Sequence, residues 1–169
     1  MKSNIVLIGM PGAGKSTVGV ILAKLTTRGF LDTDVLIQTS TRRSLQSIID
    51  SDGYLTLRLL EEHVLLGLEC EWHVIATGGS AVYSQTAMEH LAINSIMVFL
   101  DADLATLESR VGDIRTRGIA HRPGQSFADL FVERRCLYLN YADLVVTCSG
   151  QTQEMVCAAI IDGLHVPCS

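Results

Sequence analysis

The chain carries near its start the stretch Gly9-Met10-Pro11-Gly12-Ala13-Gly14-Lys15-Ser16-Thr17, which fills every fixed position of the pattern G-x-x-x-x-G-K-[ST]. An apolar run of strand length, residues 4–8, precedes it, and a stretch typical of a helix, residues 18–25, follows it. In this setting the backbone N–H groups of the loop curl around phosphate oxygens, and the helix N-terminus adds a partial positive charge. The stretch therefore predicts a P-loop that binds a nucleoside triphosphate, which we expect to be ATP.

The loop offers the nucleotide two kinds of contact. Its glycines let the backbone approach the phosphates, whereas Lys15 reaches the terminal phosphates and Ser16 offers a hydroxyl to Mg²⁺. We therefore expect ATP and Mg²⁺ as cofactors, with Ser16 as a metal ligand. The expected nucleotide-binding residues of the loop are Gly12, Ala13, Gly14, Lys15, Ser16 and Thr17.

Composition restricts the class of protein. With 169 residues, 48% of them hydrophobic, the chain suits one compact domain with a buried core, residues 1–169. The net charge of −5 argues against a nucleic-acid-binding protein, and no apolar run is long enough to span a membrane. The five cysteines are odd in number and include no C-x-x-C pair, which favours reduced thiols. We expect a monomeric cytoplasmic protein that binds neither nucleic acid nor membrane.

Strand-like apolar runs alternate with helical stretches along the chain. The expected strands are residues 5–8, 30–31, 73–76, 95–100 and 144–147. The expected helices are residues 17–25, 45–67, 86–91, 103–111, 127–141 and 153–164, and a long helical stretch from residue 34 to residue 62 is inserted between two strands. This alternation predicts an α/β layer fold with a parallel sheet.

The polar stretch 112–126 is long for a loop within a compact domain. It contains Arg115, Arg117 and Arg122 within eight residues. Such a loop suits a lid that closes over the nucleotide and excludes water. An ordinary surface loop is the alternative.

Two aspartates follow the second expected strand, at the sheet edge where ligands of parallel sheets bind. Asp32 and Asp34 are two residues apart and point the same way on an extended backbone. One suits the outer shell of Mg²⁺, and the other suits an acceptor hydroxyl that attacks a phosphate. Alternatively, Asp34 caps the helix that follows.

Three weaker signals point to an anionic substrate. Arg58 and Glu61 lie on one helical face, so that Glu61 fixes the guanidinium for a carboxylate, or the two form a plain surface ion pair. Gly78 and Gly79 follow a strand and permit close backbone approach to a ligand, or mark a tight turn. Arg134, followed by another arginine, suits a second anion clamp or a solvated helix face.

Taken together and in this order, the P-loop, Asp32-Thr33-Asp34, Arg58, Gly78-Gly79, Arg110, Arg122-Pro123 and Arg134 resemble the shikimate kinase family over residues 4–147. The resemblance implies the α/β P-loop NTPase three-layer fold of nucleoside monophosphate kinases, with a five-stranded parallel sheet flanked by helices. It implies a core of residues 1–34, 68–111 and 127–169, a substrate-binding insertion at about 35–67 and a mobile lid at about 112–126. The implied activity is transfer of the ATP γ-phosphate to the 3-hydroxyl of shikimate, a step of aromatic amino-acid biosynthesis.

The resemblance also implies roles on the acceptor side. Asp34 would contact the shikimate hydroxyls and act as base or orienting group. Arg58 and Arg134 would grip the carboxylate, and Gly78 and Gly79 would lie against the ring.

On the nucleotide side, the resemblance implies that Lys15 and Arg122 stabilise charge on the transferring phosphate. Ser16 would bind Mg²⁺ with Asp32 in its outer shell, and Arg110 would lie near the adenine. The implied catalytic residues are thus Lys15, Asp34 and Arg122.

The chain departs from the family pattern at several positions. Ser80 replaces the third glycine of a Gly-Gly-Gly loop, and Arg122-Pro123-Gly124-Gln125 stands where the family has Arg-Pro-Leu-Leu. Two alternatives therefore stay open. One is a kinase of the same fold for another hydroxy acid, such as gluconate, and the other is a binding module that has lost catalysis.

Overall fold

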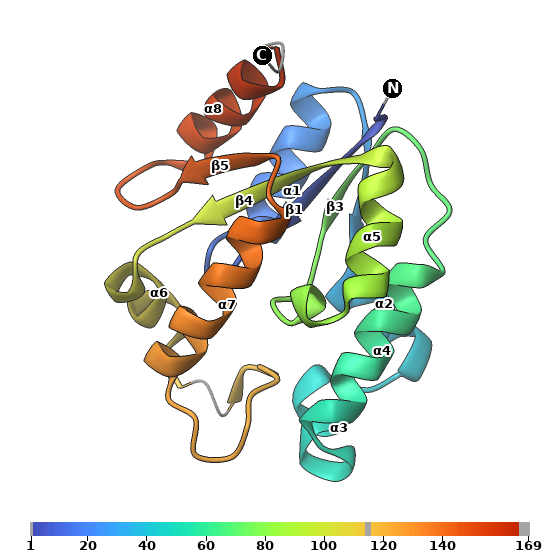
Figure 1. Cartoon of the computed structure of the whole chain (residues 1–169), viewed down its shortest axis with the longest axis vertical. Helices are drawn as coiled ribbons and strands as arrows, with labels where there is room; N and C mark the ends of the chain where they lie inside the picture. The colour runs from blue at the N-terminus through green and yellow to red at the C-terminus, as the bar shows by residue number, and fades with distance from the viewer. Residues whose placement is uncertain (1, 114–115, 166–169) are drawn as a thin grey trace.

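The computed structural model describes residues 2–113 and 116–165 and forms one layered α/β unit (Figure 1). Its five strands are all parallel and lie in the order β2-β3-β1-β4-β5. Their bounds are β1 (Asn4–Ile8), β2 (Gly29–Asp32), β3 (His73–Ala76), β4 (Ser95–Asp101) and β5 (Leu144–Thr147). The predicted strands and the five-stranded parallel sheet are confirmed.

Helices cover both faces of this sheet. Helices α1 and α8 pack together on one face, and α5 and α7 lie on the other (Figure 1). The central strand β1 is buried along its whole length, as expected for a parallel strand covered on both faces. The helices are α1 (Lys15–Leu25), α2 (Thr33–Thr41), α3 (Leu45–Asp52), α4 (Tyr54–Leu66), α5 (Gln85–Asn94), α6 (Leu104–Val111), α7 (Phe127–Tyr141) and α8 (Gln153–His165), with the 3₁₀ helix η1 (Ala81–Tyr83).

The insertion between β2 and β3 consists of three helices, α2, α3 and α4. The predicted single helix over residues 45–67 is wrong, because Gly53 separates α3 from α4 with φ +85° and ψ 162°. Residues with a side chain rarely adopt this backbone conformation, so the glycine permits the break. A second small core joins the insertion to the segment that follows α6, through Ile37, Ile48, Leu57 and Ala120.

Segment 112–126 lies partly against the insertion. The N–H of Gly118 donates to the Gln46 side chain on α3 (2.8 Å), and Ile119 and Ala120 are buried. Gly118 has φ +64°, and a Cβ on it would lie 2.6 Å from Leu45. Arg115, one of the three arginines noted in this segment, lies outside the described residues, and lid motion stays a prediction.

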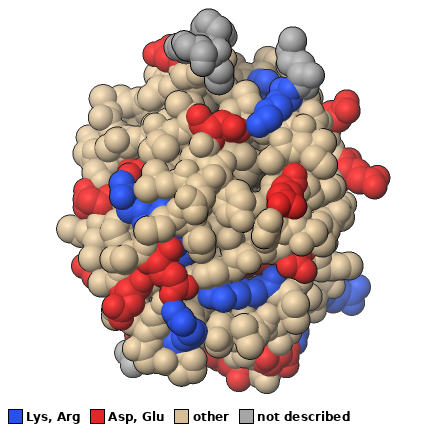
Figure 2. All heavy atoms as spheres, viewed as in Figure 1, with Lys and Arg blue, Asp and Glu red and all other residues tan. Residues whose placement is uncertain are grey.

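The parallel strands bring their carboxyl ends to one edge of the sheet. The P-loop follows β1, Asp32 ends β2 and leads directly into α2, and residues 77–80 follow β3. Figure 2 shows acidic and basic side chains interspersed over one face of the molecule. Within the described ranges, no helix combines the length and apolarity needed to cross a bilayer.

Candidate active site

Lys15 is the first residue of α1, directly after the P-loop glycines that follow β1. Its Nζ donates to the carbonyl oxygens of Gly9 (2.7 Å) and Met10 (2.9 Å), and the residue is buried. Burial lowers the pKa of Lys15 to about 8, although the Asp34 carboxylate works in the opposite direction. The loop therefore fixes a cationic group where a phosphate would lie.

A hollow of about 460 Å³, here named the P-loop hollow, lies against the loop. Arg110 and Arg117 line it from the other side, and Arg117 Nη2 donates to the Arg110 carbonyl oxygen (3.2 Å). Arg110 Nη1 in turn donates to the carbonyl oxygen of Gly12 (3.2 Å). Ala13 does not line the hollow; it is buried, and its N–H donates to the Met10 carbonyl (3.1 Å). The predicted loop residues that do line it are Gly12, Gly14, Lys15, Ser16 and Thr17.

Ser16 and Asp32 form a pair of hard oxygen donors beside the loop. The Ser16 hydroxyl donates to Asp32 Oδ2 (2.5 Å), and Asp32 Oδ1 accepts from the N–H groups of Asp34 (3.0 Å) and Val35 (3.3 Å). Asp32 is therefore the N-cap of α2, and the alternative that Asp34 caps this helix is wrong. A hydroxyl and a carboxylate fit Mg²⁺. The described residues contain no group of three or more His, Cys, Asp or Glu side chains that suits a metal, so such an ion would take further ligands from phosphate and water.

A second, smaller hollow of about 70 Å³, here named the Gly79 hollow, adjoins the first. Lys15, Asp34 and Arg117 line both hollows. If one ligand occupied each hollow, the two ligands would therefore come into contact beside these three side chains. This arrangement suits transfer of a group between two bound molecules.

Asp34 is the carboxylate at this junction. It lies in the first turn of α2, which the Asp32 cap fixes at the end of β2. Burial raises the pKa of Asp34 to about 6, and the positive charge of Lys15 limits the rise. At neutral pH the group is mostly ionised and able to accept a proton from a hydroxyl.

Arg134 and Gly79 form the far wall of the Gly79 hollow. Arg134 is only 1% exposed, and its Nη2 donates to the Ala120 carbonyl oxygen. A Cβ on Gly79 would lie 2.8 Å from Arg134 Nη1 and 2.9 Å from the Pro11 ring, so glycine is required here. The Tyr138 hydroxyl donates to the Gly79 carbonyl (2.6 Å) and fixes this turn against α7.

Neither expected arrangement of Arg58 and Glu61, a carboxylate that fixes the guanidinium or a surface ion pair, is present. No hydrogen bond or ion pair joins these two described residues; Glu61 is buried and accepts a hydrogen bond from the Ser80 hydroxyl. Burial raises the pKa of Glu61 to about 8, and Asp34 adds to the rise. Gly78 packs against the same carboxylate, because a Cβ on it would overlap Glu61. Arg58 lies outside the wall of the Gly79 hollow, and its guanidinium stacks on a tyrosine ring instead.

Two arginines of segment 112–126 lie in different places relative to the hollows. Arg122 lines neither hollow, and its guanidinium pairs with Glu133 on α7 while its side chain is 60% exposed. Arg117 lines both hollows. From the sequence, Arg117 was expected only in the lid, because Arg122-Pro123 matched the Arg-Pro of the family pattern. No local sequence pattern distinguishes the two arginines; their positions relative to the hollows do.

Arg135 is not an anion clamp. It makes two hydrogen bonds to the Asp101 carboxylate at the end of β4, at 3.1 and 2.7 Å. Of the two consecutive arginines on α7, only Arg134 reaches the hollows.

This fold and this pair of hollows define a P-loop kinase that acts on a small molecule. Other kinases share the architecture: an APS kinase from Mycobacterium tuberculosis, in complex with AMPPNP and APS, has a TM-score of 0.56 at 17% identity, which bears on the fold alone.

A model of the shikimate kinase family matches residues 11–165. The chain is 32% identical to shikimate kinase 2 of Enterobacter sp. (strain 638), over 100% of this chain and 99% of that protein. It is 34% identical to a shikimate kinase of Mycobacterium tuberculosis, over 99% of this chain and 96% of that protein. The chain therefore belongs to the shikimate kinase family.

Solved structures agree with this assignment. The shikimate kinase of Acinetobacter baumannii in complex with shikimate has a TM-score of 0.88 at 30% identity, covering 96% of this chain and 92% of that one. The shikimate kinase of Aquifex aeolicus has a TM-score of 0.83 at 33% identity, with 95% of each chain covered.

Proposed function

We propose that this chain transfers the γ-phosphoryl group of ATP to the 3-hydroxyl of shikimate. The observation that carries the proposal is the pair of adjoining hollows with Lys15, Asp34 and Arg117 in their common wall. Membership of the shikimate kinase family supports ATP and shikimate as the ligands. In this proposal ATP binds in the P-loop hollow and shikimate binds in the Gly79 hollow.

The chemistry follows from the groups at the junction. Asp34 holds the acceptor hydroxyl and takes up its proton as the oxygen bonds to the γ-phosphorus. The bond from that phosphorus to the bridging oxygen of ADP breaks, and ADP leaves. Lys15 and Arg117 balance the negative charge that spreads over the transferring group.

Ser16 and Asp32 are the residues that would hold Mg²⁺, directly and through water respectively. When bound, the ion supplies positive charge to the β- and γ-phosphates. Arg110, beside Gly12 at the rim of the P-loop hollow, is proposed to face the adenine.

The acceptor carboxylate is proposed to lie between Arg58 and Arg134. Guanidinium groups bind carboxylates through paired N–H donors, which fixes orientation as well as charge. The Gly79 backbone, kept free of a side chain by Arg134 and Pro11, then lies against the ring.

The assay that tests this function couples ADP formation to added shikimate, with purified protein, ATP and Mg²⁺. We expect ADP formation that requires shikimate and exceeds that with gluconate at equal concentration. Faster turnover of gluconate would establish a kinase for another acceptor. Binding of shikimate by calorimetry without any phosphoryl transfer would establish a binding module. A cytoplasmic location and a monomeric state stay predictions from sequence.

A further inference from the structure

Tyr83 contacts both arginines proposed to grip the acceptor carboxylate. Its ring lies against the Arg58 guanidinium, with 3.6 Å between the ring centroid and Cζ. Its hydroxyl accepts from Arg134 Nε (3.4 Å), and the Arg134 Cζ lies 5.3 Å from the ring centroid. One side chain, placed by η1 directly after the Gly78–Ser80 turn, thus touches two cations that come from α4 and α7.

Arg58 depends on this ring more than Arg134 does. Arg134 is held by the Ala120 carbonyl, whereas Arg58 Nε is buried without a hydrogen-bond partner. A second ring, that of Tyr54, lies farther away, at 5.2 Å from the Arg58 Cζ. A guanidinium stacked flat on an aromatic face keeps its edge N–H donors available for a carboxylate.

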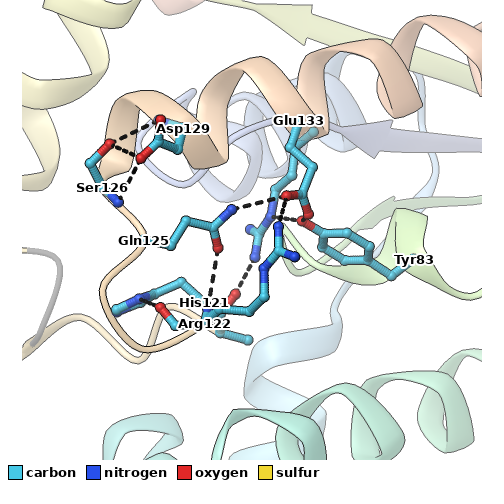
Figure 3. Close-up of polar contacts among 9 residues, drawn as sticks. Tyr83, His121, Arg122, Gln125, Ser126, Asp129 and Glu133 are labelled. Atoms are coloured by element: carbon cyan, nitrogen blue, oxygen red, sulfur yellow. Dashed lines mark hydrogen bonds and ion pairs between the residues drawn. The ribbon is translucent and has the colours of Figure 1, made fainter.

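The Tyr83 hydroxyl also joins a network that reaches segment 121–125 (Figure 3). It donates to one oxygen of Glu133 on α7, and the other oxygen accepts from Arg122 and from Gln125 Nε2 (3.0 Å). Gln125 Oε1 accepts from the Arg122 N–H (3.2 Å), which closes the turn. Glu133 therefore connects this turn with the tyrosine that supports Arg58.

We propose that Tyr83 is a positioning residue for the acceptor carboxylate: its ring sets the orientation of Arg58, and its hydroxyl, through Glu133, couples Arg58 and Arg134 to segment 121–125. This inference rests on the proposed function for the identity of the acceptor. The geometry separates two contributions, because the ring acts on Arg58 and the hydroxyl acts on Arg134 and Glu133.

Two substitutions separate these contributions. We expect Tyr83→Leu, which removes the ring, to raise KM for shikimate about tenfold while KM for ATP and kcat change less than about threefold. Tyr83→Phe keeps the ring, so its KM for shikimate should stay within about threefold of the wild-type value. The matched control Tyr54→Leu removes the more distant ring and should change KM for shikimate less than Tyr83→Leu does. An unchanged KM in Tyr83→Leu, or equal rises in both KM values, would overturn the proposal.

The coupling through Glu133 has its own test. In a double-mutant cycle of Tyr83→Phe and Glu133→Ala, we expect the effects on KM for shikimate to be less than additive, because both variants remove the Tyr83–Glu133 hydrogen bond, although each also removes contacts of its own. Fully additive effects on KM for shikimate would remove the coupling from the proposal.

A measurement without substrate distinguishes failure of this inference from failure of the proposed function. The Tyr83 ring current should shift the NMR signal of the Arg58 Nε–H upfield in the wild type and in Tyr83→Phe, but not in Tyr83→Leu. Arg58→Lys identifies the signal. Absence of the shift in the wild type would overturn the positioning role whatever the acceptor. A shifted signal in a protein that neither binds nor phosphorylates shikimate would reject the proposed function and, with it, the carboxylate role.

Discussion

The two hollows of this site are built by different means. The P-loop hollow takes six of its thirteen lining residues from one continuous stretch, residues 11–17, and the other seven from α2, the residue after β3, α6, segment 117–119 and α8. The Gly79 hollow takes only Pro11 and Lys15 from that stretch, and its other lining residues come from α2, α3, α4, the residues after β3, segment 117–120 and α7, which are distant in sequence. Recognition by main chain is thus encoded locally, whereas recognition by side chains requires the whole fold.

The hollows also differ in size. The P-loop hollow, at about 460 Å³, is far larger than the Gly79 hollow, at about 70 Å³. Ser80 and Glu61 occupy part of the smaller one, and their hydrogen bond keeps the Glu61 carboxylate beside Gly78. Under the proposed function, the acceptor is selected in the smaller hollow.

The largest effect is expected where the two hollows meet, at Asp34. Asp34→Asn should lower kcat by about 10³-fold, because the acceptor hydroxyl loses its proton acceptor. In the wild type, kcat/KM should rise through about pH 6 as Asp34 ionises, and the variant should lose this rise. Steady-state ADP formation across pH measures both. The exposed Asp162→Asn on α8 is the control, and a wild-type rate in Asp34→Asn would contradict the assignment.

Arg117 and Arg122 provide a matched pair from one segment. Arg117→Ala should lower kcat about 10²-fold, because Arg117 lines both hollows and balances charge on the transferring phosphate. Arg122→Ala, which removes the pair with Glu133, should lower kcat much less. Single-turnover rates with shikimate decide between them. The reverse order would return the catalytic role to Arg122.

Arg58 tests the acceptor side alone. Arg58→Ala should raise KM for shikimate at least about thirtyfold, which corresponds to ~2 kcal/mol, the lower end for a lost charged contact. KM for ATP should stay near its wild-type value. Arg43→Ala, which removes an arginine paired with Asp52 on the surface of the insertion, is the control. An unchanged KM for shikimate would place Arg58 outside the site.

Gly12 tests the nucleotide side alone. Gly12→Ala should raise KM for ATP roughly tenfold without a matching rise for shikimate, since φ is +86° and the new Cβ would lie 2.9 Å from Val111. Gly53→Ala is a control for backbone strain, because Gly53 has φ +85° and no atom lies within 4 Å of its added Cβ. If Gly53→Ala raised KM for ATP as much as Gly12→Ala does, backbone strain in general, and not the P-loop, would explain the rise.

The smallest effect is on stability and concerns Glu61. Burial raises its pKa to about 8 from 4.5, so between these pH values the folded chain keeps a proton that the unfolded chain has lost. The free energy of unfolding should therefore fall as pH rises from about 4.5 to about 8. Asp34 contributes in the same direction from 3.8 to about 6.

Glu61→Gln cannot lose this proton, so the variant should lose most of the slope above pH 6, which is about 1.4 kcal/mol per pH unit in the wild type, and should exceed the wild type in stability at pH 8. Urea unfolding at several pH values measures the slope. Glu62→Gln, at the neighbouring position, should keep the wild-type slope. A wild-type slope in Glu61→Gln would show that another group carries the titration.

The sequence was sufficient for the features that depend on local pattern. The P-loop and all five strands were predictable, the strands to within one residue at each end, because apolar runs and glycine spacing are local signals. The break at Gly53 was missed because one glycine does not interrupt the helical periodicity on either side. The prediction placed the acid, the two arginines and Gly79 in one site from a resemblance, not from physical reasoning about contacts.

Contacts between distant residues were beyond the reach of pattern. The hydrogen bond between Ser80 and Glu61 and the stacking of Tyr83 on Arg58 join η1 and its preceding turn to α4. Neither contact has a periodic signal. For the same reason, Arg117 was distinguishable from Arg122 only when the fold showed which of them borders the hollows.

The most direct test of the account is a crystal structure of the wild type with shikimate and ADP–Mg²⁺ bound together. The account predicts the shikimate carboxylate between Arg58 and Arg134, a ring hydroxyl on the Asp34 carboxylate, and the ring against Gly79. Shikimate bound away from Asp34, or a Gly79 hollow that stays empty beside a bound nucleotide, would contradict it.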